Sequence, residues 1–309
     1  MPLFNPDNMY KKLLKQAWQI VWQHPFLWFF GLFATFLWGN EFNFLINNFS
    51  QFSNWFKNLT GSGVFIFSSF GVFSKIFSLL PGPVLISFIV LAFLGLLFLY
   101  LANLSLGAII FASRKIKDGE TTSFRETFKT GIRYSPAVIL VNILTYLVIF
   151  GLILPQKIPG LHLFLKQLHL TIPFVVIMII LILLTVVVSF LFRFTVCAIV
   201  LEKKRVLGGL KRAVGFLIKN YRPTLILTFW LFLISIAAAL LVFLILTATS
   251  LPFFALSTLF HQIGLSFLFK PLSVILFLIS LILVIFLGSI LSAYQVVAWT
   301  LFFLELKVN

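Results

Sequence analysis

Long apolar stretches without charge alternate along this chain with short segments that carry almost all of its charged residues. A helix that crosses a membrane needs about 20 apolar residues, and several of these stretches are at least that long. They are apolar on every side, whereas the strands of a membrane barrel alternate apolar and polar positions over about 10 residues. The pattern therefore predicts six transmembrane helices, at residues 25–46, 83–111, 136–154, 173–201, 223–247 and 271–304.

The composition supports the same fold class. Hydrophobic residues make up 61% of the 309 residues and charged residues only 10%. A soluble fold of this length could not bury that much apolar surface in one core. We therefore expect an all-α, polytopic membrane helical bundle, with residues 1–309 forming a single integral membrane domain. A cleaved signal peptide is not expected, because a long amphipathic lead precedes the first apolar stretch near Pro25.

The 23 lysines and arginines divide unevenly between the two sides of the predicted membrane. Seventeen lie in the N-terminal segment, the second and fourth connections and the C-terminal tail, five lie on the opposite side, and Arg193 lies within a span. Short loops rich in positive charge stay in the cytoplasm. We therefore expect a multi-pass protein of a cell membrane, the bacterial inner or plasma membrane, with the N-terminus and the C-terminus cytoplasmic.

The net charge of +16 fits this orientation and a surface of anionic lipid. A basic soluble protein that binds nucleic acid would give the same total, but its apolar residues would not form long uncharged runs. The expected partners are thus membrane lipids, anionic on the cytoplasmic face, and not nucleic acid.

Three cytoplasmic segments have helical spacing, and each is followed by a proline that is expected to begin a span, namely Pro25, Pro136 or Pro223. This predicts three repeats, 1–115, 116–205 and 206–309, each with an amphipathic helix followed by a helical hairpin. The alternative is that any basic segment beside a span looks amphipathic. Contact with lipid headgroups is expected from Lys11, Lys12, Lys15, Lys211 and Arg212. Residues 40–58 form a neutral amphipathic stripe, which predicts a helix at the outer interface or a lid over the bundle.

Arg193 is the most informative polar residue within a span, because a charge at that depth costs about 2.5–3.5 kcal/mol on insertion scales. One interpretation is that it extends along the helix to the cytoplasmic headgroups. The other is that it binds an anion or a carboxylate. In the second case it would form a polar site on the inner half of the bundle with Asn103, Tyr294 and Gln295. Hydrogen bonds between helices are the simpler role for these polar residues and for Asn142.

No motif points to an enzyme. All seven acidic residues lie in predicted loops or at span ends, so paired aspartates within the membrane are excluded. The chain has no H-E-x-x-H, G-x-S-x-G or phosphate-binding loop. Its four histidines are scattered and its single cysteine, Cys197, lies in an apolar run. We therefore expect no catalytic residue, no metal and no cofactor.

Two segments carry a resemblance to a known family. The run 15–31, with Trp18, Trp22, Pro25 and Trp28, resembles the opening of bacterial membrane proteins related to the membrane domain of glycerophosphoryl diester phosphodiesterases. The segment 209–223 is similar to the helix that precedes a span in those proteins. In the enzymes of that family a separate soluble barrel domain performs the chemistry, and this chain has no room for one. The resemblance implies a six-helix membrane module without hydrolase activity.

Three functional hypotheses follow. The first is a non-enzymatic membrane module that contacts lipid or a small amphiphile through its basic helices. The second is a solute transporter or channel whose path passes Arg193. The third is an assembly or scaffold partner for another membrane protein or for a second copy of the chain, with a small-residue face at Gly288, Ser289, Ser292 and Ala293.

Overall fold

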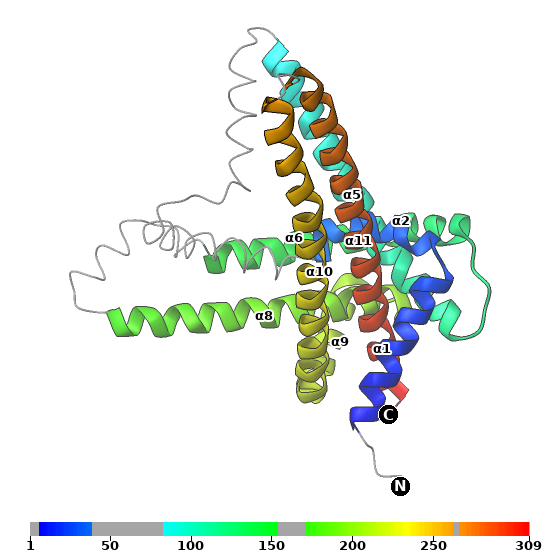
Figure 1. The fold of residues 1–309 in the computed structure, drawn as a ribbon. Coiled ribbons are helices and arrows are strands. Elements are labelled where there is room, and N and C mark those ends of the chain that lie inside the picture. The colour runs from blue at the N-terminus through cyan, green and yellow to red at the C-terminus, as the bar shows by residue number, and fades with distance from the viewer. Residues whose placement is uncertain (1–5, 39–82, 154–170, 263–265, 309) are drawn as a thin grey trace.

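The computed structural model describes residues 6–38, 83–153, 171–262 and 266–308, and these residues are helical almost throughout (Figure 1). No strand occurs among them. In chain order the helices are α1 (Pro6–Gln23), α2 (Phe26–Trp38), α5 (Pro83–Lys117), α6 (Phe124–Ile153), α8 (Thr171–Glu202), α9 (Val206–Lys219), α10 (Tyr221–Gln262) and α11 (Ser266–Val308).

Five of the described helices are long and apolar enough to cross a membrane, namely α5, α6, α8, α10 and α11. The chain is therefore a multi-pass integral membrane protein. The first predicted span, 25–46, is represented by α2, which has 13 residues. The rest of that span and the amphipathic stripe at 40–58 lie outside the described residues, so a sixth span remains a prediction.

The middle unit differs from the sequence prediction. Helix α6 runs without a break from Phe124 through Pro136, so the amphipathic segment is not a separate helix there and Pro136 does not begin a helix. Proline lacks the N–H that would bond to the carbonyl of Ile132 four residues earlier. The Ser135 hydroxyl donates to that carbonyl at 2.9 Å instead, which keeps the helix continuous.

Consecutive predicted spans pack against one another: α2 against α5, α6 against α8, and α10 against α11. Figure 1 shows α10 and α11 upright, with α6 and α8 running across them. Helix α1 packs on α11, and α9 packs on α8. Two of the connections, 39–82 and 154–170, lie outside the described residues, so the arrangement as three repeated hairpins remains a prediction.

The buried core lies where the C-terminal halves of α5, α8 and α11 meet. Residues 102–110, 192–201 and 296–303 are buried without interruption. Away from this core the long helices expose large apolar side chains, including Leu96, Phe150, Leu244 and Ile282, each more than 60% exposed. In a membrane such side chains face lipid.

The small residues of α11 are used for packing within the chain. Gly31 of α2 lies against the backbone carbonyl of Ser289, where an added Cβ would collide, and against the Cβ of Ala293. Ser289, Ser292 and Ala293 are all buried. A close approach of this kind is typical of small residues between membrane helices. Helix α2 therefore covers the predicted assembly face at Ser289 and Ala293.

Candidate functional site

Helix α9 has three distinct faces. Gly209, Ala213 and Phe216 are buried against the rest of the protein. A second face exposes four apolar side chains at spacings of three, four and four residues, so they form one stripe. Lysines and an arginine lie beside this stripe. The stripe consists of Leu207 (78% exposed), Leu210 (39%), Val214 (39%) and Ile218 (71%).

Gly209 sets how closely α9 can approach α8. A Cβ built on Gly209 would lie 3.0 Å from the Ile199 side chain and 3.4 Å from the Thr195 carbonyl oxygen. Farther along α9, the Phe216 ring packs on Phe194 of α8, with ring centroids 4.8 Å apart. Because α9 buries this narrow face, its apolar stripe remains partly exposed at Leu210 and Val214 and mostly exposed at Leu207 and Ile218.

Glu202, the last residue of α8, joins three basic side chains. Its carboxylate lies 3.0 Å from the Lys204 ammonium, 3.4 Å from Nε of Arg212 and 3.3 Å from the Lys307 ammonium. The Glu202 side chain is 8% exposed, whereas its three partners are 40–45% exposed. One carboxylate therefore holds three cations in place, and their net charge remains positive.

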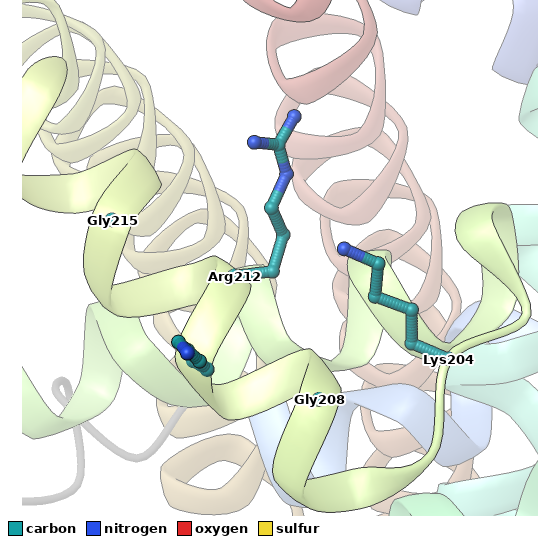
Figure 2. A pocket seen from close by; sticks show the side chains of 5 residues that line it. Lys204, Gly208, Arg212 and Gly215 are labelled. Carbon is teal, nitrogen blue, oxygen red and sulfur yellow. The ribbon is translucent and has the colours of Figure 1, made fainter.

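A shallow, open pocket of about 400 Å³ lies over α9 beside this ionic cluster. It is lined by Lys204, Gly208, Lys211, Arg212 and Gly215. Figure 2 shows Lys204 and Arg212 extending in the same general direction, with Gly208 and Gly215 on the flanking turns of α9. A Cβ on Gly215 would meet nothing within 4 Å, so the absence of side chains at the glycines leaves this space open.

Helix α1 presents a second basic surface. Lys11, Lys12 and Lys15 are exposed. Lys11 and Lys15 share one helical face with Trp18 and Trp22, which are 49% and 56% exposed and stack with ring centroids 5.4 Å apart. Tryptophan is enriched at membrane interfaces, where one part of the ring is apolar and another is wet.

The remaining acidic side chains near these surfaces are also paired. Lys117 and Glu305 lie 3.0 Å apart, which joins α5 to α11, and Lys115 lies 2.8 Å from Glu126. Arg114 donates a hydrogen bond of 2.8 Å to the carbonyl oxygen of Leu201 at the end of α8. These contacts hold the basic helix ends together.

The four residues predicted to form a polar inner site each contact a different neighbour. Asn142 donates from Nδ2 to Oδ1 of Asn103 at 3.1 Å, which joins α6 to α5. Gln295 donates to the Ser235 hydroxyl at 2.7 Å, which joins α11 to α10. The structure thus assigns Asn103 and Gln295 to hydrogen bonds between helices, the simpler of the two predicted roles.

Tyr294 and Arg193 are buried, at 4% and 6% exposure. The Tyr294 ring meets the edge of Trp18 at 5.9 Å, and the Arg193 guanidinium lies 4.9 Å from the centre of the Trp299 ring. Arg193 is thus enclosed by protein, whereas a side chain extending to the headgroups would follow a lipid-facing surface. A cation over an indole ring is a favourable electrostatic contact.

Sequence reasoning identified Lys211 and Arg212 but missed Glu202, Lys204, Gly208 and Gly215. A signal for Glu202 was present, because it is the only acidic residue in the interval 127–304 and is followed directly by three basic residues. The two glycines gave no such signal, since their role depends on which face of α9 is buried.

Comparisons with protein-family models, curated proteins and solved structures found no match to this chain. The resemblance to the membrane domain of glycerophosphoryl diester phosphodiesterases therefore remains a prediction. Among the described residues no group of three histidine, cysteine or acidic side chains could hold a metal ion.

Proposed function

We propose that this protein is a non-enzymatic membrane module that contacts anionic lipid, or a small amphiphile of the same chemistry, through α1 and α9. Both helices would lie on the cytoplasmic surface of a bacterial cell membrane. The observation that carries the proposal is α9, where an exposed apolar stripe adjoins exposed cations on a helix fixed to the protein by its third face. Such a helix buries its stripe among acyl chains while its cations meet headgroups.

Helix α1 supports the proposal independently. Lys11 and Lys15 would meet phosphate groups, and Trp18 and Trp22 would lie at the depth of the headgroups. The predicted orientation and the resemblance to a six-helix membrane module fit this role. The resemblance adds no catalytic residue to it.

The test compares the protein in nanodiscs that contain brominated phosphatidylglycerol or brominated phosphatidylcholine, with tryptophan fluorescence as the readout. We expect stronger quenching by the anionic lipid. In the variant K11Q/K12Q/K15Q this preference should fall by an order of magnitude or more, since each basic residue near an anionic surface contributes about 1 kcal/mol.

The matched control is K57Q/K75Q/K157Q, which removes the same charge from the predicted outer side. It should leave the preference in place. Unchanged quenching in the inner variant, or an equal loss in the outer one, would overturn the proposal.

A second candidate, a solute path past Arg193, is favoured by one observation. Trp299 Nε1 and Ser292 Oγ are buried on α11 without a hydrogen-bond partner among the described residues, and Arg193 lies over the Trp299 ring. Unpaired buried donors are costly and suit a bound polar ligand. Cysteines placed at positions 193, 103 and 294 in a Cys197→Ala background would distinguish the candidates. Labelling of all three by a membrane-impermeant thiol reagent would support transport, and protection of all three would remove that support.

A further inference from the structure

The pocket on α9 has the charge and the surroundings of a phosphate site. Lys204, Lys211 and Arg212 line it, and the nearby carboxylate of Glu202 is shared among Lys204, Arg212 and Lys307. The helix dipole places partial positive charge at the N-terminus of α9, close to Lys204 in the sequence. No side chain caps this end at Arg205. An anion bound in the pocket would balance the positive charge that the Glu202 carboxylate alone does not compensate.

The position of the apolar stripe narrows the class of anion. Leu207, Leu210, Val214 and Ile218 follow the length of α9 next to Lys211, and they are exposed. A free inorganic anion would use the cations alone, whereas a phospholipid would use the cations for its phosphate and the stripe for its acyl chains. Both features on one 14-residue helix favour the lipid.

The ionic cluster also prepares the site in advance. Lys204 lies 3.0 Å from Oε2 of Glu202, and Nε of Arg212 lies 3.4 Å from Oε1 without a hydrogen bond to it, so both cations are drawn to one carboxylate. The terminal nitrogens of Arg212 remain for another acceptor, and cations already gathered in one place favour the binding of a phosphate. The space above Gly208 and Gly215 accommodates the headgroup.

We infer that the α9 pocket binds the phosphate of one anionic phospholipid between Lys204, Lys211 and Arg212, with the acyl chains along the stripe of α9. The inference rests on the proposed function and deepens it. General contact with lipid needs only a basic surface, whereas binding of one lipid molecule also needs the pocket on α9.

The test titrates the detergent-solubilised full chain with dioleoylphosphatidylglycerol and counts bound lipids by native mass spectrometry. We expect one lipid to bind more tightly than the rest and more tightly than dioleoylphosphatidylcholine. Lys211→Gln should weaken this first step about fivefold, the factor expected for one basic residue at an anionic headgroup. Lys219→Gln removes the same charge from α9 outside the pocket lining and should leave the step unchanged.

Gly215→Leu separates the shaped site from the basic surface. It keeps every charge and fills the pocket, and its Cβ meets no neighbour within 4 Å, so folding should be retained. We expect the single tight step to disappear while the weaker, surface-driven binding persists. An unchanged first step in Gly215→Leu, or equal losses in Lys211→Gln and Lys219→Gln, would overturn the inference and leave the proposed function standing.

Competition with inorganic phosphate distinguishes a phospholipid site from a site for a free anion. If the lipid is the ligand, millimolar phosphate should not displace the first phosphatidylglycerol. Displacement, or retention of phosphate in place of the lipid, would show a site for a free anion and overturn the assignment to phospholipid. Unchanged lipid preference in the K11Q/K12Q/K15Q nanodiscs would count against the proposed function alone, because that variant leaves the α9 pocket intact.

Discussion

The Lys307 ammonium lies 3.3 Å from the Glu202 carboxylate and so joins the end of α11 to the end of α8, two helices that meet in the buried core. Lys204 and Arg212 use the same carboxylate. The three cations that surround Glu202 therefore depend on one acidic residue for their arrangement.

Glu202→Gln should lower the stability of the protein. The substitution keeps the shape of the side chain but leaves three cations without their counter-charge. Since those cations are 40–45% exposed, solvent screens them, and we expect a loss of about 1–2 kcal/mol. The apparent melting temperature in detergent measures it. Glu120→Gln is the control, because Glu120 is 59% exposed beside Lys115 and should change stability little. Equal losses in both variants would contradict the special role of Glu202.

Gly31→Ala should destabilise the contact between α2 and α11. The added methyl group would collide with the Ser289 carbonyl oxygen, and backbone atoms cannot turn away as a side chain can. We expect a cost of about 1–3 kcal/mol, the usual range for overpacking. Gly288→Ala lies one residue from Ser289 and meets nothing within 4 Å, so it should be neutral or slightly stabilising. A thermal shift assay on both variants tests the difference, and similar melting temperatures would argue against the close approach.

The Asn103–Asn142 hydrogen bond should appear as an energetic coupling between α5 and α6. A double-mutant cycle with Asn103→Ala and Asn142→Ala is expected to give about 0.6 kcal/mol and at most about 1.7 kcal/mol, the range for polar pairs between membrane helices. Unfolding in mixed SDS micelles supplies the free energies. Asn103→Ala combined with Ser235→Ala serves as the control cycle, because Ser235 bonds to Gln295 and the two effects should add. No coupling in the first cycle would contradict the hydrogen bond.

Cys197 should resist N-ethylmaleimide while the protein is folded. The residue is 1% exposed within the core, so the reagent cannot reach the sulfur. Labelling should become rapid once SDS unfolds the chain. In the Cys197→Ala background, Glu120→Cys should react at once, because Glu120 lies in a polar connection and its side chain is 59% exposed. Rapid labelling of Cys197 in the native protein would mean that the packing of α8 differs from the one described.

The candidate site could be predicted only in part. Lys211 and Arg212 were accessible to sequence reasoning because their spacing opposes the apolar residues of the same helix. Gly208 and Gly215 were not, since a glycine shapes a pocket only when its face of the helix is exposed. The joint polar site predicted for Arg193, Asn103, Tyr294 and Gln295 rests on their similar depth in the membrane. Depth does not say which neighbouring helix a side chain faces, and Gln295 bonds to Ser235 of α10.

The sequence by itself determined that this chain lies in a membrane as apolar helices, because uncharged runs of this length leave the backbone no other way to satisfy its hydrogen bonds there. It also determined which segments carry the basic charge. Only the tertiary structure decided that α6 continues through Pro136, that Glu202 gathers Lys204, Arg212 and Lys307, and that α9 turns its apolar stripe outward. Those features depend on contacts between residues far apart in the chain, which local hydrophobic spacing does not encode.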